Sequence, residues 1–327
     1  MISRTKYPIT NEEIQLLSEQ AGLGAVKNAS PLGAGEYNAV YLVQTNSGEY
    51  VLKIAPPVSV PVMTYEQGMM KAEIFWYEQM RTQSSIRVPR IVYSDMSCAV
   101  FPAEFFFMER LPGKQLNEMD FSEEEKTTAA GATARMAAEL HRIKGDRFGY
   151  LQLGLHDDWY EAYRAIIESL VADGMRQGYT SRRGKRLLQY IDKYHSVLKE
   201  APCCMVNFDI WAPNILCERT EAGIQYAWID PERSFWGDAI WDFICLELFT
   251  PLAEKKKSLK AYNEATDLPV VATREEQIRY AFAQAHMGLI MEIEKYYRYT
   301  LHHAGWWRNV YVSWFLFRHA FATLKQV

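Results

Sequence analysis

The sequence predicts an α+β protein with a small, strand-rich first part and a larger, mostly helical second part. Three observations support this fold class. Strand-like segments joined by tight turns dominate up to about residue 112, one helical segment interrupts them, and helical patterns dominate beyond Pro112-Gly113. We therefore expect one lobe at residues 1–112 and a second at 113–327, each long enough to bury its own core.

The first part begins with a short helix. Thr10 and Glu13 form a capping box ahead of residues 11–21, and Gly22 is a typical helix stop. Two strand-like segments follow, at residues 38–45 and 49–54, and the N-S-G turn between them makes a hairpin. A helical segment comes next, at 65–81, and two more strand-like segments lie at 88–95 and 103–111. This order predicts a small antiparallel sheet with one inserted helix.

The second part opens with another capping box, formed by Ser122 and Glu125, and a helix that extends to about Ile143. Further helical patterns cover residues 158–173, 184–199, 240–249, 273–299 and 306–324. The charged run 254–257 with Lys260 is typical of a solvated loop or helix face.

Composition limits the function classes. The net charge of −4 gives no basic excess of the kind that binds nucleic acid. The N-terminus lacks the apolar region of a signal peptide, and no window approaches 18 uninterrupted apolar residues, so we expect a cytoplasmic protein without a membrane span. The five cysteines lack C-x-x-C spacing, which favours reduced thiols over a zinc site. Oligomeric state cannot be read from the sequence.

The candidate catalytic and metal-binding residues are concentrated between residues 205 and 242. Asp209 and Asn214 have the spacing D-x-x-x-x-N, and an apolar run, a turn and a second apolar run lead to Asp230. A hairpin would bring the two carboxylates and the carboxamide to one end of a sheet. Phosphoryl transfer needs such a set, because one group accepts the proton of the attacking hydroxyl while two oxygen ligands hold Mg²⁺. Each element alone also occurs in ordinary turns.

Two glycines precede the first clear strand, at positions 33 and 35 in L-G-A-G-E-Y-N-A-V-Y. Backbone without Cβ atoms could approach a polyphosphate there, although a G-x-G turn is also common without a ligand. The segment lacks the G-K-[ST] of a Walker A loop, and Asn38 replaces the third glycine of G-x-G-x-x-G.

Lys53 lies in the apolar strand V-L-K-I, where a lysine is disfavoured unless it reaches a cleft or a partner. We interpret it as a cation for the nucleotide phosphates, with an exposed strand lysine as the alternative. Glu73, in the following helix, is the preferred carboxylate partner, and Glu66 and Glu78 compete with it.

The chain resembles the aminoglycoside phosphotransferase family of small-molecule kinases, which share the bilobal protein-kinase-like fold. The resemblance rests on L-G-A-G-E-Y-N-A-V-Y, V-L-K-I, K-A-E-I-F-W-Y, F-F-F-M-E-R-L-P-G, N-F-D-I-W-A-P-N-I-L and W-I-D-P-E-R-S-F-W-G-D-A-I-W-D. It implies that Asp209 is the catalytic base, that Asn214 and Asp230 bind Mg²⁺, that Lys53 contacts the phosphates of ATP or GTP, and that Glu73 orients Lys53.

The resemblance implies further roles. Backbone groups near Glu109 and Leu111 would hold the purine edge, and Asp238 and Asp242 match a G-D-x-x-x-D ending with a structural role. The family usually has H-G-D at its base, whereas this chain has Asn207-Phe208-Asp209. We expect transfer of the γ-phosphate to a hydroxyl of a small molecule: an aminoglycoside, an amino alcohol or a sugar. The alternative is a weak or inactive kinase-like binding module. Protein substrates are disfavoured because no A-P-E segment follows Asp230.

Overall fold

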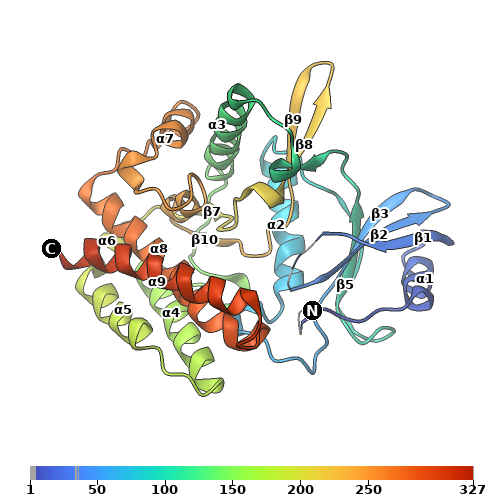
Figure 1. Cartoon of the computed structure of the whole chain (residues 1–327), viewed down its shortest axis with the longest axis horizontal. Helices are drawn as coiled ribbons and strands as arrows, with labels where there is room; N and C mark the ends of the chain where they lie inside the picture. The colour runs from blue at the N-terminus through green and yellow to red at the C-terminus, as the bar shows by residue number, and fades with distance from the viewer. Residues whose placement is uncertain (1–4, 34, 36, 327) are drawn as a thin grey trace.

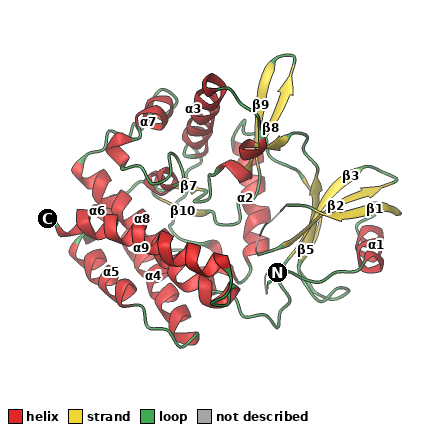
Figure 2. Ribbon diagram, viewed as in Figure 1, coloured by secondary structure: helices red, strands yellow, loops and turns green. Residues whose placement is uncertain are grey.

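A computed structural model describes residues 5–33, 35 and 37–326, and it confirms the predicted fold class (Figure 1). An antiparallel sheet lies on one side of the molecule and a helical region on the other (Figure 2). The elements of the first part are α1 (Asn11–Gln20), β1 (Val26–Pro31), β2 (Ala39–Thr45), β3 (Glu49–Ile54), the 3-10 turn η1 (Thr64–Glu66), α2 (Met69–Gln83), β4 (Ile91–Asp95) and β5 (Phe105–Glu109).

The five strands form one sheet in the order β1-β2-β3-β5-β4, and every neighbouring pair is antiparallel. Side chains alternate between the two faces of a strand. In β3, Leu52 and Ile54 therefore join the core beneath α1, whereas Val51 and Lys53 lie on the opposite face, toward α2. Strand alternation alone thus directs the lysine toward the inserted helix.

Helix α2 connects the two parts of the molecule. Its buried residues Met69, Ala72, Glu73, Trp76 and Tyr77 recur at helical spacing, so they form one continuous face. The Trp76 ring contacts Trp236 of the helical part with centroids 5.1 Å apart, and a single hydrophobic cluster extends through both parts. In Figure 1, α2 lies between the sheet and the helices. The boundary at residue 112 stays a prediction.

The second part contains two further short strand groups and most of the described helices. Its elements are β6 (Lys114–Gln115), η2 (Leu116–Glu118), α3 (Glu123–Leu140), η3 (Leu151–Leu153), α4 (Trp159–Arg176), α5 (Arg182–Lys193), α6 (His195–Lys199), β7 (Cys204–Val206), η4 (Ala212–Asn214), β8 (Ile215–Thr220), β9 (Gly223–Trp228), β10 (Phe235–Gly237), η5 (Ala239–Ile244), η6 (Leu252–Glu254), α7 (Lys256–Asn263), α8 (Arg274–Arg298) and α9 (Ala304–Lys325). Strands β6, β8 and β9 form a three-stranded sheet, and β7 pairs with β10. In the described part of the chain, no helix is long and apolar enough to cross a bilayer.

Three predicted helices need correction. Residues 240–249 form only the 3-10 turn η5, and the backbone then becomes left-handed at Glu247 and Phe249, which ends any helix. The helix expected at 65–81 starts at Met69, because Gly68 has a φ of 71° and separates it from η1. The pattern at 184–199 divides into α5 and α6 at Tyr194, whose φ and ψ of −106° and 25° leave the helical region.

Candidate active site

Lys53 occupies the centre of a buried group of charges between β3 and α2. Its Nζ lies 2.7 Å from Glu73 Oε2, 2.5 Å from Asp230 Oδ1 and 3.0 Å from Glu232 Oε2. The structure thus brings together the three predicted residues Lys53, Glu73 and Asp230. The two competitors lie elsewhere, since Glu66 pairs with Arg298 and Glu78 pairs with Arg81.

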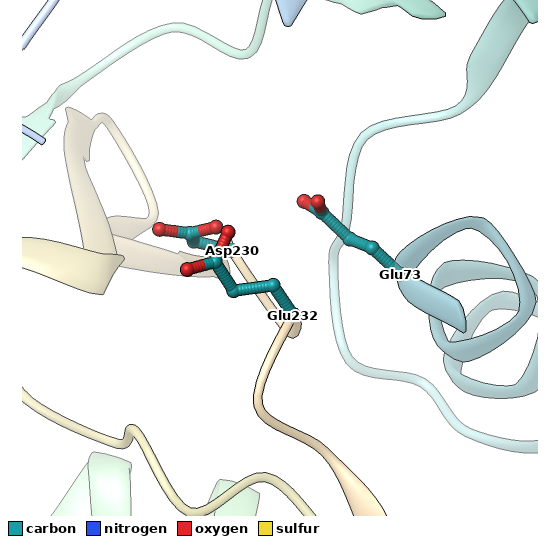
Figure 3. A group of neighbouring side chains, drawn as sticks. All are labelled: Glu73, Asp230 and Glu232. Atoms are coloured by element: carbon teal, nitrogen blue, oxygen red, sulfur yellow. The ribbon is translucent and has the colours of Figure 1, made fainter. Parts of the chain in front are cut away.

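The three carboxylates come from two segments that face each other. Figure 3 shows Glu73 pointing from α2 toward Asp230 and Glu232, which follow the end of β9. Ligand atoms of all three lie within 4.8 Å of one another, close enough to share a cation. Glu232 was missed by the sequence analysis. The D-P-E run was its only sequence signal, because the second residue after a strand-end aspartate can point back to the same place.

The carboxylates of this group repel one another in a buried site. Burial raises the pKa of Glu73 to about 8 and that of Glu232 above its usual value, and the neighbouring Asp230 adds to both shifts. A divalent cation held there would favour the ionised carboxylates. Burial lowers the pKa of Lys53, but Asp230, Glu232 and Glu73 together raise it well above its usual value, so the lysine stays charged. The side chain of Asp230 is 36% exposed, whereas those of Glu73 and Glu232 are nearly buried. Asp230 is therefore the most accessible carboxylate of this group.

Asp209 precedes the 3-10 turn η4, and Asn214 is the last residue of that turn. Asn214 Nδ2 donates to the backbone carbonyl of Asp209 over 3.1 Å and to its Oδ2 over 3.3 Å, so the carboxamide fixes the carboxylate. The N–H of Ile229 donates to the carbonyl of Asn214 over 3.0 Å, which places Asn214 beside the strand end that carries Asp230. Asp209, Asn214 and Asp230 therefore belong to one region, as the spacing predicts.

The Asp209 carboxylate has an electrostatic environment suited to proton transfer. Burial raises its pKa to about 7; Arg233 opposes this shift, and Asp230 and Glu232 contribute to it. Arg233 Nε lies 4.0 Å from Asp209 Oδ2, and its Nη2 donates to Glu294 Oε1 over 3.0 Å. A carboxylate with a pKa near neutrality can accept a proton and release it again. Arg233 was also missed by the sequence analysis.

The acids of the G-D-x-x-x-D ending brace the surrounding loops. Asp242 accepts the N–H groups of Asn207 and Phe208 over 3.0 and 2.5 Å, and its Oδ2 lies 2.9 Å from His141 Nε2. Asp238 caps η5 through the N–H of Ile240. Neither acid contacts Lys53 in the described structure, and their partners are those of supporting residues.

The glycine segment leads directly to the charged group. Gly33 has a φ of 73°, a left-handed conformation that glycine adopts without strain, and a Cβ atom at Gly35 would meet nothing within 4 Å. Asn38, at the position of the missing third glycine, donates from Nδ2 to Glu232 Oε2 over 2.8 Å. The backbone at Gly35 is therefore unobstructed, and the nearby Asn38 side chain is hydrogen-bonded to Glu232.

The predicted purine-binding segment lies where β5 ends. Glu109 is its last residue and is exposed, while Leu111 is buried. The N–H of Glu109 donates to the carbonyl of Arg90 over 2.9 Å, so a purine edge would use other backbone groups of residues 109–111.

Residues 28–274 match the sequence pattern of the phosphotransferase enzyme family abbreviated APH. The chain belongs to this family. No curated protein matches the sequence.

Solved structures of APH-like proteins share the fold at low identity. A candidate fructosamine-3-kinase from Thermobifida fusca has a TM-score of 0.66 at 18% identity, over 96% of this chain and 100% of the other. An aminoglycoside phosphotransferase in complex with AMP-PNP and hygromycin B gives 0.61 at 15% identity, over 95% and 97%. A microcompartment-associated aminopropanol kinase gives 0.61 at 16%, over 96% and 98%.

The acidic clusters of the second part have partners of their own. Glu123 and Glu125 occupy the first turn of α3, where they pair with Lys126 and Arg219. Asp158 caps α4. The tryptophans differ among themselves: Trp241 is buried in the core, whereas Trp211, two residues after Asp209, is 50% exposed.

Proposed function

We propose that the protein transfers the γ-phosphate of ATP or GTP to a hydroxyl of a small molecule. The observation that carries this proposal is the convergence of Lys53, Glu73 and Asp230 in one buried charge group beside Asp209 and Asn214. The AMP-PNP complex of the structural neighbour supports ATP as the donor. The nucleotide would lie between lobes at residues 1–112 and 113–327, with its phosphates at Gly33, Gly35 and Lys53 and its base at Glu109 and Leu111.

Mg²⁺ fits the donor set, because carboxylate and carboxamide oxygens are the ligands it takes from proteins. Asp230 and Asn214 would hold it, and Glu232 is a third candidate ligand. When bound, Mg²⁺ neutralises the negative charge on the phosphates. The cluster of Glu73, Asp230 and Glu232 supports this assignment, because their ligand atoms lie within 4.8 Å of one another and a divalent cation would relieve their mutual repulsion.

Asp209 would act as the general base. Asn214 orients its carboxylate through the 3.3 Å hydrogen bond, and Arg233 favours its ionised form. The acceptor hydroxyl would donate its proton to Asp209 as the oxygen attacks the γ-phosphate. Lys53, oriented by Glu73, would balance charge on the phosphates.

The acceptor would be a sugar, an amino alcohol or an aminoglycoside. The exposed indole of Trp211 offers a flat face to a sugar ring or to an ammonium group close to Asp209. The names of the neighbours, which include a fructosamine kinase, an aminopropanol kinase and an aminoglycoside phosphotransferase, support hydroxyl acceptors that carry amines.

The decisive experiment measures phosphate transfer to a panel of ketosamines, amino alcohols, sugars and aminoglycosides, with ATP and GTP in parallel. Asp209→Ala should lower turnover by about 10²- to 10⁴-fold and leave nucleotide affinity nearly unchanged. A matched control is Asp192→Ala, because Asp192 is an acid that pairs with Arg164 on the surface of α4 and α5. Unchanged turnover in Asp209→Ala would refute the role of the base.

The second candidate function is a binding module without catalysis. Only Asn207 and Phe208, in place of the family's His-Gly, favour it. Such a module would gain thermal stability from Mg-ATP or Mg-GTP and would transfer phosphate to no member of the acceptor panel, so the same panel separates the two functions.

A further inference from the structure

Phe208, directly before Asp209, adopts a backbone conformation that glycine normally occupies. Its φ is 62°, in the left-handed region, and its side chain is fully buried. For a residue other than glycine this conformation is disfavoured, because the Cβ atom crowds the following carbonyl oxygen. Something in the structure must therefore hold the phenylalanine there.

The side chain of Phe208 is held by an aromatic stack with α8. Its ring lies 4.7 Å from the imidazole of His286 at an interplanar angle of 25°, and the ring of Phe235 meets it edge-on at 5.6 Å. Burial of the phenyl ring against these partners offsets the backbone strain.

His286 is itself fixed in one orientation. It is fully buried, and its Nδ1 accepts a hydrogen bond from Trp241 Nε1 over 3.2 Å. Burial lowers the pKa of His286 to about 3, so the ring stays neutral and keeps the Trp241 bond at physiological pH.

The backbone around Phe208 is held by a second, independent anchor. The Asp242 carboxylate accepts the N–H groups of Asn207 and Phe208, and Asn207 Oδ1 accepts the N–H of Asp209 over 3.0 Å. Asp242 thus holds the backbone of this loop through hydrogen bonds, whereas His286 of α8 holds the Phe208 side chain through ring stacking. Asp209 follows at once, so any rotation at Phe208 would move the carboxylate.

We propose that Phe208 and His286 form a positioning pair, in which the imidazole of α8 clamps the phenyl ring and so holds Asp209 in its reactive orientation. The pair would take the place of the family's histidine–glycine sequence before the base. The expected effect of the pair on turnover rests on the proposed function. Its expected effect on the conformation of the loop rests on the geometry alone.

The test compares four single variants. Phe208→Gly should fold, because glycine suits a φ of 62°, and its kcat should fall by about 10- to 100-fold, the scale set by a misplaced catalytic group. KM for Mg-nucleotide should change less than about twofold, since the ring contacts of Phe208 are with Phe235 and His286, which belong to neither the phosphate nor the metal site. His286→Phe keeps a ring against Phe208 and should retain most of kcat, whereas His286→Leu should lose as much as Phe208→Gly.

Phe282→Leu is the matched control for lost core packing. Phe282 is another buried aromatic of α8, and it contacts Tyr163 and Tyr194 instead of the loop. It should lower Tm as His286→Leu does and leave kcat unchanged. Equal kcat in His286→Phe and His286→Leu would overturn the proposal, and so would a loss of kcat in the control that matches the loss in Phe208→Gly.

A second readout does not depend on turnover. Hydrogen exchange at the Asp209 N–H should quicken at least about tenfold in Phe208→Gly and His286→Leu, but not in His286→Phe, because the loop opens locally when the stack is lost. If the wild-type protein transfers no phosphate, the proposed function fails. Hydrogen exchange alone then tests whether Phe208 and His286 hold the loop. Unchanged exchange in Phe208→Gly would overturn it.

Discussion

Asn38 Nδ2 donates a hydrogen bond to Glu232 Oε2 over 2.8 Å, between residues 194 positions apart in the chain. The same Glu232 oxygen lies 3.0 Å from Lys53 Nζ. The end of the glycine segment is thus joined to the strand end that carries Asp230. This relationship ties the proposed phosphate-binding segment to the candidate metal ligands.

Asn38→Asp should weaken Mg-nucleotide binding by about tenfold or more, because a new carboxylate next to Glu232 adds like charge in a buried site. Titration calorimetry with Mg-ATP measures the change. Asn28→Asp is the control, since Asn28 is an exposed strand residue bonded only to Gln44 among the described side chains. Equal affinities in both variants and the wild type would contradict the link.

Asp230→Asn and Glu232→Gln should both raise the Mg²⁺ concentration needed for nucleotide binding, and Asp230→Asn should raise it more. Asp230 is the most exposed carboxylate of the group, whereas Glu232 is buried and binds both Lys53 and Asn38 through its Oε2. Nucleotide binding measured across a magnesium titration gives the two half-saturation points. Unaltered binding in Asp230→Asn would rule out its role as a metal ligand.

Activity should rise with pH through a midpoint near 7 and level off above about pH 8, because Asp209 must be ionised to accept a proton and its pKa is about 7. Arg233→Gln should shift this rise to higher pH, since the arginine favours the ionised carboxylate. Arg233→Lys keeps the charge and should stay close to the wild type. The pH profile of kcat/KM tests all three, and a flat profile between pH 5 and 8 would contradict the assignment.

Asp209→Asn should make the free protein more stable at pH 8. An unfolded aspartate ionises near pH ~4, while the folded carboxyl ionises near pH 7, so its ionisation destabilises the fold progressively across that interval. Removing the titration should restore at least about 1 kcal/mol at pH 8, or roughly 2 °C in Tm, and almost nothing at pH 4. Thermal melts at the two pH values provide the measurement. A lower Tm at pH 8 would show that the carboxylate is stabilised in the fold.

Gly113→Ala should destabilise the junction between the two parts, because a Cβ atom there would lie 2.6 Å from the carbonyl oxygen of Cys217. Gly223→Ala is a close control: the two glycines have φ values of 111° and 114°, but nothing lies within 4 Å of a Cβ atom at Gly223. We expect Gly113→Ala to cost about 1–3 kcal/mol more than Gly223→Ala, the usual scale of overpacking. Denaturant unfolding of both variants measures the difference.

Local signals in the sequence predicted the elements with local causes. The capping boxes at Thr10 and Ser122 start α1 and α3 where expected, because such boxes satisfy the first N–H groups of a helix from within four residues. The helix expected at 240–249 is not formed, because contacts with distant residues override its local pattern. Its apolar spacing suits a helix, but Asp242 is held by the loop at Asn207 and His141, which lie far away in the chain.

By itself the sequence determined the order of the chemical groups, the hairpins and capped helices that carry them, and the partner expected for Lys53. Only the tertiary structure decided that Glu232 and Asn38 complete the charge group, that Arg233 faces Asp209, and that His286 holds Phe208. The physical reason is range: hydrogen-bonded turns and caps depend on residues a few positions apart, whereas buried charges and stacked rings acquire partners only when the two parts of the chain pack together.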